Sequence, residues 1–68
     1  MLTPQELLIL NMVKLGFTDK GIGYRLSLSR RTIQNHLQLI YTKLRVHNRT
    51  AAVITAYKKG YLDFEEAI

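Results

Sequence analysis

The chain has 68 residues, a formal net charge of +5, 47% apolar residues and 22% charged residues. This length fits one small domain and excludes a multi-domain enzyme, and the composition is that of a globular chain rather than a disordered tail. The absence of cysteine excludes disulfides, thiolate catalysis and cysteine-containing zinc sites, and it favours a reducing compartment.

No segment of the sequence has the length or pattern of a membrane span or export signal. The longest apolar run covers residues 7–10, far short of the roughly 18 residues that cross a bilayer. It follows neither a basic segment nor a small-residue cleavage site. We therefore expect a soluble cytoplasmic protein with no membrane partner.

Positive charge is concentrated in the middle of the chain. No acidic residue lies between Asp19 and Asp63, and the remaining acids are near the two ends. The basic residues of this stretch are Lys20, Arg25, Arg30, Arg31, Lys43, Arg45, Arg49, Lys58 and Lys59. This distribution favours a polyanionic partner, with nucleic acid first and an anionic membrane surface second.

The first half of the chain predicts two helices. Residues 3–6, Thr-Pro-Gln-Glu, form a capping-box pattern that starts the first helix, and Gly16 is placed to end it. Thr18 is placed to cap a short second helix. Gly21 and Gly23 lie inside that helix, where each costs about 1 kcal/mol relative to alanine. We therefore expect tertiary packing to hold the second helix in place.

The second half predicts two more helices. After a turn at residues 27–29, Ser29 is an N-cap for a helix through about Leu44. Its apolar stripe consists of Ile33, Leu37, Ile40 and Leu44, and its opposite, polar face consists of Arg31, Gln34, Asn35, Gln38 and Thr42. Asn48 caps a fourth helix to about Lys59, which Gly60 ends, and Ala52, Val53 and Ala56 are expected on its core side. We predict an all-α fold in one domain, residues 1–68, with an acidic tail at 63–68.

A short helix, a tight turn and a longer helix with a basic start form the helix-turn-helix arrangement, whose second helix fits the DNA major groove. Spacing alone leaves a purely structural bundle as an equal alternative. The basic middle of the chain favours DNA binding.

The residues themselves resemble the LuxR/GerE-type DNA-binding domain over about residues 2–62. The most specific part is the run T-I-x-N-H-L-x-x-I-x-x-K-L from Thr32, followed by V-x-N-R-T-x-A-V from Val46. The other matching positions are Leu2, Thr3, Glu6, Ile9, Leu10, Ile22, Leu26 and Ser29. The resemblance implies a bacterial transcription factor fold of four helices, in which the third reads the major groove and the fourth commonly pairs two subunits.

The sequence departs from the family pattern at several positions. Gly21 and Gly23 replace a glutamate and an alanine, which predicts a looser second helix. Arg45 replaces a glycine, which argues against a left-handed residue at the end of the third helix. Leucines stand at three normally polar positions: Leu7, Leu8 and Leu15. Most family members also carry a receiver or ligand-sensing domain, so the chain is either a free-standing regulator or a fragment of one.

The polar face of the third helix carries the expected base-reading residues, Gln34, Asn35 and Gln38. Glutamine and asparagine amides pair with adenine through two hydrogen bonds, so A·T pairs are the expected targets. The alternative is a face that is only solvated. The family often has an apolar contact at the second of these positions, which leaves Asn35 the weakest member of the set.

Basic and hydroxyl side chains around the third helix are expected to contact DNA phosphates, which fixes register without reading sequence. The expected contacts are Arg30, Arg31, Thr32, His36, Lys43 and Arg49. Arg49 has an internal alternative, an ion pair with Glu6. Lys20 and Arg25 rank lower because their helix can face away from the groove.

We expect a two-fold dimer on DNA, because a single recognition helix contacts only a few base pairs, too few to select one site in a genome. The expected interface is the outer side of the fourth helix: Ala51, Ile54, Thr55 and Lys58. This patch is too slight for a stable dimer in solution, where specific interfaces bury about 1,200 Å² or more. We expect a monomer or weak dimer that pairs on DNA.

No cofactor, metal or catalytic activity is expected. His36 and His47 have no carboxylate near them in the sequence, and the chain is too small to enclose a substrate pocket. Two other functions remain open: a promoter-binding domain like region 4 of sigma factors, and a protein-interaction module that docks another regulator through leucines 7, 8 and 15. RNA polymerase and a separate sensing domain are further possible partners.

Overall fold

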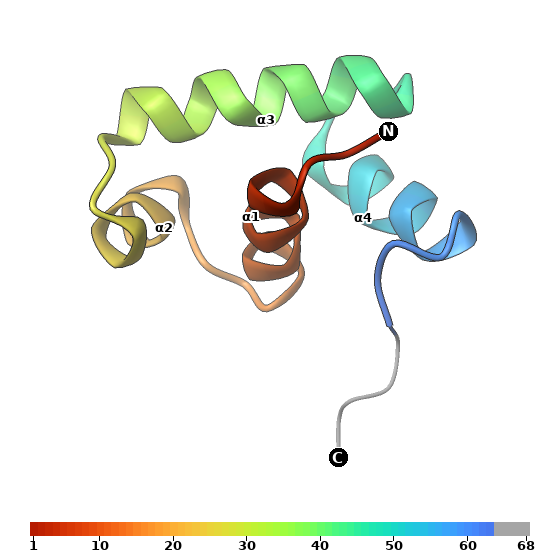
Figure 1. Ribbon diagram of the computed structural model, residues 1–68, viewed down its shortest axis with the longest axis horizontal. Helices are drawn as coiled ribbons and strands as arrows, with labels where there is room; N and C mark the ends of the chain where they lie inside the picture. The colour runs from red at the N-terminus through yellow and green to blue at the C-terminus, as the bar shows by residue number, and fades with distance from the viewer. Residues whose placement is uncertain (64–68) are drawn as a thin grey trace.

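The computed structural model describes residues 1–63, and within them it contains four α-helices and no strand. They are α1 (Pro4–Lys14), α2 (Asp19–Leu26), α3 (Arg30–Leu44) and α4 (Arg49–Lys58). Figure 1 shows α3 lying across the top of the molecule, with α1, α2 and α4 beneath it. The all-α prediction is confirmed. The acidic tail expected at 63–68 lies, except for Asp63, outside the described residues.

Each helix begins where the sequence predicted, because an N-cap side chain accepts a backbone N–H of the first turn. Thr3 Oγ1 accepts from the Glu6 N–H at 3.1 Å, and Glu6 Oε1 accepts from the Thr3 N–H at 2.9 Å, which completes the capping box. The side chains of Thr18, Ser29 and Asn48 cap α2, α3 and α4 in the same way. These contacts satisfy donors that have no partner within the helix.

The end of α3 differs from the sequence prediction. Arg45 adopts the left-handed conformation, with φ 61° and ψ 45°, although the residue is not glycine. Its N–H donates to the Thr42 carbonyl at 3.2 Å, and the Val46 N–H donates to the Tyr41 carbonyl at 3.0 Å. These closing hydrogen bonds compensate for a left-handed cost of about 1–2 kcal/mol. The prediction that Arg45 argues against this cap was therefore wrong.

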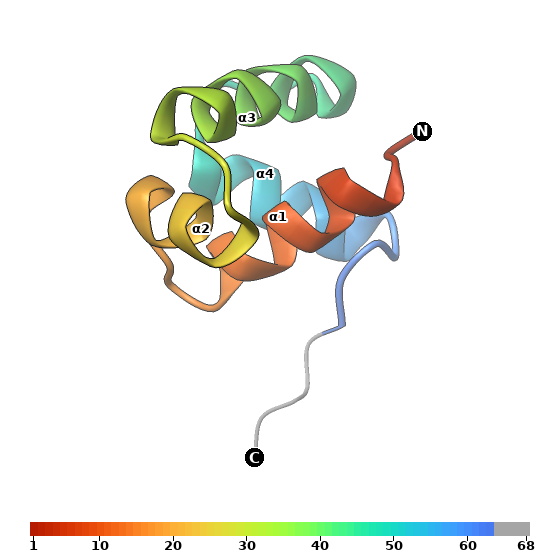
Figure 2. The same cartoon turned by 60° about the vertical axis from the view of Figure 1, so that its left-hand side comes forward.

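The apolar stripe of α3 lies in the core, as predicted. Ile33, Leu37, Ile40 and Leu44 are all buried, and α1, α2 and α4 each pack against α3. The other buried apolar residues are Leu2, Ile9, Leu10, Met12, Ile22, Ala52, Ala56 and Leu62. Figure 2 shows α1, α2 and α4 on the same side of α3. One long side of α3 is thus left facing solvent.

Gly23 explains how α2 and α3 come close together. A Cβ at this position would lie 2.5 Å from the Leu28 carbonyl oxygen, a distance that real Cβ atoms do not show. The Leu28 N–H also donates to the Gly23 carbonyl at 2.8 Å, which folds the turn back against the end of α2. The glycine that weakens the helix locally therefore permits the turn that sets α3 against α2.

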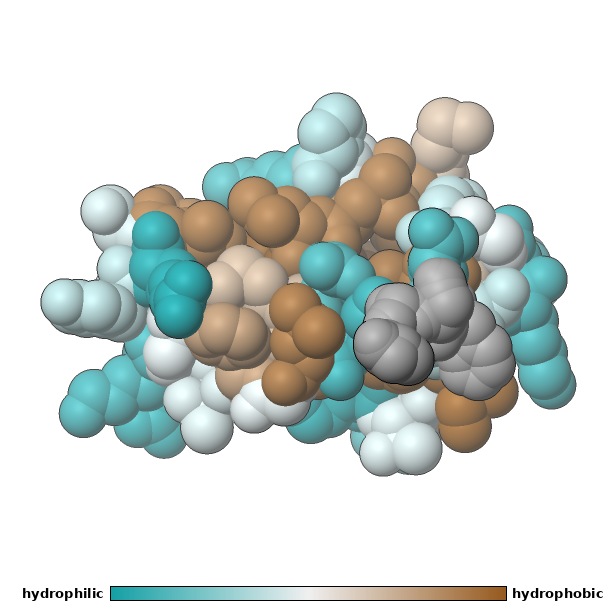
Figure 3. All heavy atoms as spheres, turned by 90° about the horizontal axis from the view of Figure 1, so that it is seen from below, coloured by the Kyte–Doolittle hydropathy of each residue, from teal (hydrophilic) through white to brown (hydrophobic). Residues whose placement is uncertain are grey.

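The face opposite α3 carries many apolar side chains. Figure 3 views this face and shows hydrophobic residues gathered across its middle. Leu8 and Leu15 are exposed, at 47% and 61% of their surfaces, in agreement with the sequence interpretation. Leu7, the third leucine at a normally polar position, is half-buried and packs against the core.

Candidate nucleic-acid interface

A row of polar side chains covers the outer side of α3. Its members are all exposed: Arg31, Gln34, Asn35, Gln38 and Thr42. They lie opposite the buried stripe because successive residues of an α-helix are 100° apart. The structure therefore brings the three expected base-reading side chains together on one ridge that no other helix covers.

The first turn of α3 holds three of the expected phosphate contacts. The Arg30 and Arg31 side chains are exposed. Thr32 is half-buried, and its hydroxyl lies 2.8 Å from Ser29 Oγ, in a pair where either oxygen can donate. His36, one turn further on, is also half-buried. The two arginines are thus the open donors of this turn, while Thr32 takes part in the helix cap.

Lys43 is held by a carboxylate of another helix. Its Nζ donates to Glu6 Oε1 at 2.8 Å and to Glu6 Oε2 at 3.1 Å. Burial raises the pKa of the Glu6 carboxyl, but hydrogen bonds from Lys43 and Thr3 outweigh this effect, so the pKa lies below its ordinary value. The internal partner of Glu6 is therefore Lys43, and the suggested pairing of Glu6 with Arg49 was wrong.

Arg49 pairs instead with the first residue of α2. Its Nη1 donates to Asp19 Oδ1 at 2.9 Å, which joins the starts of α4 and α2. Tyr41 of α3 lies close to this pair: burial raises the pKa of its hydroxyl, with Arg49 opposing and Asp19 reinforcing that shift. The electrostatic environment of Arg49 is thus set by residues from two other helices.

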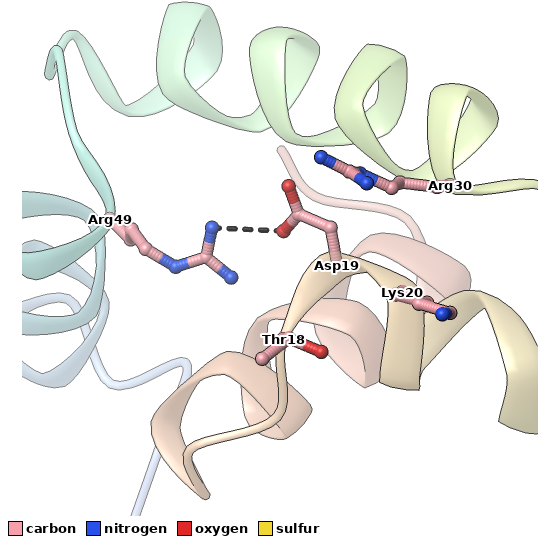
Figure 4. A pocket seen from close by; sticks show the side chains of 5 residues that line it. All are labelled: Thr18, Asp19, Lys20, Arg30 and Arg49. Carbon is pink, nitrogen blue, oxygen red and sulfur yellow. Dashed lines mark hydrogen bonds and ion pairs between the residues drawn. The ribbon is translucent and has the colours of Figure 1, made fainter.

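A hollow of about 520 Å³ lies beside this ion pair (Figure 4). We call it the α2–α4 hollow, and its lining residues are Thr18, Asp19, Lys20, Arg30 and Arg49. Figure 4 shows the Asp19 carboxylate pointing up between the guanidinium groups of Arg49 and Arg30, beneath α3. The hollow therefore gathers basic groups from three helices beside the exposed ridge.

The expected phosphate contacts divide between the two sides of α3. Arg30 lies on the side of the α2–α4 hollow, whereas Lys43 reaches the opposite side, toward α1, where it contacts Glu6. A helix in a groove has one phosphate backbone along each side. The arrangement supplies basic groups on both sides of the ridge, although the Lys43 ammonium is already paired.

The expected dimer patch lies on the accessible part of α4. Ile54 is 49% exposed and Lys58 is exposed, whereas Ala51 and Thr55 are half-buried. On the core side, Ala56 is buried and Val53 is half-buried against the core, as predicted. Ile54 is thus the large apolar side chain that this patch presents to solvent.

The sequence interpretation overlooked two residues near the ridge, Asp19 and Leu39, and ranked a third, Lys20, low. Asp19 was treated only as a boundary of the basic stretch, and Lys20 was ranked low, yet both line the α2–α4 hollow. Leu39 is 55% exposed on α3, beside Gln38. The sequence did hold a signal for Leu39, because it is an apolar residue that lies outside the apolar stripe of α3. Nothing in the sequence pointed to the meeting of Asp19 with Arg49.

The described residues contain no cluster of three potential metal ligands, counting histidine, cysteine, aspartate and glutamate. Within the same residues, no helix combines the length and apolar character needed to cross a membrane.

Comparison with known proteins matches residues 1–56 to a family described as bacterial regulatory proteins, luxR family. The transcriptional regulatory protein ComA of Bacillus subtilis (strain 168) is 48% identical over 61 residues, which cover 90% of this chain and 28% of ComA. The transcriptional regulatory protein YdfI of the same strain is 38% identical over 64 residues, which cover 94% of this chain and 30% of YdfI. The chain thus spans less than a third of the length of these relatives.

Solved structures show the same similarity. The crystal structure of the anti-activator RapF complexed with the ComA DNA-binding domain matches with a TM-score of 0.82 and 47% identity, over 84% of this chain and 98% of that chain. The response regulator ChrA of a heme-sensing two-component system matches with a TM-score of 0.88 and 34% identity, over 91% of this chain and 31% of that chain. The chain therefore belongs to the LuxR family of bacterial regulatory proteins, a family of helix-turn-helix DNA-binding domains of transcription regulators that is not an enzyme class.

Proposed function

We propose that the chain binds double-stranded DNA in a sequence-specific manner, with α3 in the major groove. The observation that carries this proposal is the exposed polar ridge of α3, which lies opposite the buried stripe and is covered by no other helix. An α-helix has the right diameter for the major groove, where each base pair presents a distinct pattern of donors and acceptors. The outer side of α3 is therefore the reading surface.

Gln34 and Gln38 carry the base reading in this proposal, with Asn35 beside them. All three amides are exposed, and an amide can donate and accept at once, which matches adenine in the major groove. The exposed Leu39 adds a place for an apolar contact with a thymine methyl group. Sites rich in A·T pairs at the centre of each half-site are the expected targets.

Arg30 and Arg31 are the proposed phosphate contacts at the start of α3, because their side chains are exposed and basic. Arg49 contributes from the start of α4. Thr32 and His36 are half-buried, so their contribution is smaller. Lys43 acts mainly through Glu6, by holding α3 against α1 at the angle that presents the ridge.

We further propose that the domain covers residues 1–68 and works as a two-fold dimer on DNA through the outer side of α4. Two α3 helices on one face of the duplex multiply the discrimination of one, and symmetry requires a self-complementary patch. We place the protein in the bacterial cytoplasm, bound to the nucleoid, without cofactor or catalytic activity. RNA polymerase and a sensing domain beyond this chain are its further proposed partners.

The test is binding of the chain to labelled duplex DNA, measured by fluorescence anisotropy between 50 and 200 mM salt in steps, with selection from a random pool to identify the site. If about five phosphates are neutralised per monomer, the log–log slope of affinity against salt is near −4.5, from −0.9 for each contact. A slope near zero, or a pool that yields no preferred sequence, contradicts the proposal.

A second function is favoured by one specific observation, the exposed leucines Leu8 and Leu15. Figure 3 also shows hydrophobic residues gathered at the middle of the face opposite α3. The ComA DNA-binding domain is found complexed with the anti-activator RapF, so a related domain is held by a regulator protein. We propose docking of a regulatory protein as the second candidate. A module that worked only by docking would not retard DNA in a gel at low salt, which separates the two functions.

A further inference from the structure

Three cations and one carboxylate line the α2–α4 hollow. Lys20, Arg30 and Arg49 come from α2, α3 and α4, and Asp19 is the one acid among the lining residues, so the lining carries a net charge of +2. Arg30 and Arg49 are the first residues of their helices, as Asp19 is of α2. These side chains are therefore carried by packed helices rather than by loops, which limits how far they can move apart.

The Asp19 carboxylate occupies the place where an external anion would sit. It points up between the guanidinium groups of Arg30 and Arg49 (Figure 4), and it accepts a hydrogen bond from Arg49 Nη1 at 2.9 Å. The Arg49 side chain remains 41% exposed, whereas that of Asp19 is only 19% exposed. A guanidinium has five N–H donors and binds carboxylate and phosphate oxygens with the same fork geometry. Arg49 can thus exchange one anion for the other without leaving its helix.

The position of the hollow favours a phosphate of DNA as the anion. Arg30 lines the hollow and also begins α3, whose exposed ridge starts one residue later at Arg31. A duplex that receives the ridge in its major groove has a sugar-phosphate backbone along that side of α3. The hollow is therefore next to the path of a backbone.

We infer that the α2–α4 hollow binds one backbone phosphate of DNA, and that Asp19 is an internal competitor that holds Arg49 in the free protein and opposes the phosphate. This inference rests on the proposed DNA binding. Phosphates are the same in every sequence, so Asp19 weakens binding to all duplexes by about the same factor. The carboxylate thereby limits how strongly the domain is retained on non-specific DNA.

The test replaces Asp19 with asparagine, which has almost the same shape and keeps an oxygen for Arg49 but carries no charge. We expect Asp19→Asn to tighten binding to a random duplex at about 0.15 M salt by about three- to tenfold, from removal of one like charge several ångströms from a phosphate. The log–log salt slope becomes steeper by about one contact. Unchanged or weaker binding of a folded Asp19→Asn variant overturns the inference.

The matched control is Asp63→Asn, which changes the net charge equally at an exposed position that follows α4, outside the hollow. We expect less than a twofold change for this variant, because exposed charges beyond about 10 Å are screened at physiological salt. An equal gain from both variants shows an effect of net charge alone and overturns the role of the hollow. If the unmodified chain binds no DNA at all, the proposed function itself is wrong; if it binds and only Asp19→Asn is without effect, this inference alone fails.

A second comparison separates competition from a structural role. In the wild type, binding the phosphate requires Arg49 to give up its ion pair with Asp19, which offsets part of what Arg49 contributes. Arg49→Gln should therefore cost less affinity in the wild-type background than in Asp19→Asn, where Arg49 is already released. A purely structural ion pair predicts weaker DNA binding and a lower melting temperature for both single variants, which overturns the inference.

A titration with inorganic phosphate tests whether the hollow binds a small phosphorylated ligand instead of a DNA phosphate. In a titration followed by amide chemical shifts of residues 18–20 and 49, we expect no saturation below about 1 mM, because a single phosphate lacks the other contacts of a duplex. Saturation below that concentration assigns the hollow to a small phosphorylated ligand and overturns the assignment to DNA.

Discussion

The ammonium of Lys43 donates to both carboxylate oxygens of Glu6, at 2.8 and 3.1 Å, although the two residues are 37 positions apart. This contact ties the last turn of α3 to the first turn of α1. Glu6 is at the same time the last residue of the capping box, where it accepts the Thr3 N–H. One nearly buried carboxylate therefore fixes both the start of α1 and the position of α3.

The first prediction separates these two roles of Glu6. Glu6→Gln retains an acceptor for the cap but loses the charge, whereas Glu6→Ala loses both. We expect Glu6→Gln to lower the free energy of unfolding by about 1–3 kcal/mol. The lower end of this range reflects solvent screening of the ion pair, because the Lys43 side chain is partly exposed. Glu6→Ala should cost about 1 kcal/mol more, the worth of a cap. Denaturant unfolding measures both: equal losses would show that the cap contributes nothing, and an unchanged stability of Glu6→Gln would show that the ion pair contributes nothing.

The same carboxylate predicts a dependence on pH. The pKa of Glu6 in the folded protein lies below its ordinary value of 4.5, so its stabilisation is complete above that value and is lost as pH falls through the folded pKa. We therefore expect wild type and Glu6→Gln to differ fully at pH 6 to 7 and to converge under acid conditions. Thermal melts of both proteins across this pH range test the prediction. A stability difference that grows as the pH falls would contradict it.

Arg31 provides the prediction for phosphate contacts. Its side chain is exposed at the start of the α3 ridge and does not line the α2–α4 hollow. Arg31→Ala should weaken binding to all sequences about equally and flatten the log–log salt slope by about one contact. Lys59→Ala is the control, since it removes an equal charge from an exposed position beyond the end of α4. A loss confined to the preferred site would make Arg31 a base-reading residue.

Gln34 and Gln38 are expected to carry base discrimination. Replacing either with alanine should cost about 1–3 kcal/mol on the selected site and little on random DNA, because only base contacts depend on sequence. Thr42→Ala is the control on the same ridge. Its hydroxyl donates to the Gln38 carbonyl at 3.0 Å, so it already has a partner within the helix. Equal losses on both kinds of DNA would assign the glutamines to the backbone.

Ile54 tests the dimer on DNA. Ile54→Glu places like charges across the proposed two-fold axis, so it should abolish cooperative filling of two half-sites while leaving binding to one half-site almost unchanged. Leu15→Glu is the control, because it puts the same charge at an exposed leucine just after α1. Footprinting on single and paired half-sites measures both. If cooperativity survives Ile54→Glu and is lost in Leu15→Glu, the interface lies around Leu15 at the end of α1 instead.

The sequence by itself determined the four helices and their order, because the patterns that mark them are local. Each N-cap side chain contacts an N–H three residues away, and the stripe of α3 repeats every three or four residues. The exposed ridge followed from the same periodicity, so Gln34 and Gln38 could be placed on the surface without a structure. The family resemblance then pointed to DNA.

Only the tertiary structure decided which charges meet. The pairs Glu6–Lys43 and Asp19–Arg49 join residues 37 and 30 positions apart, and the sequence interpretation assigned the wrong cation to Glu6. Such pairs depend on the angles at which the helices cross, which are set by packing and by close approaches such as that at Gly23. The α2–α4 hollow exists for the same reason: its lining comes from the starts of three helices that local patterns locate along the chain but do not orient in space.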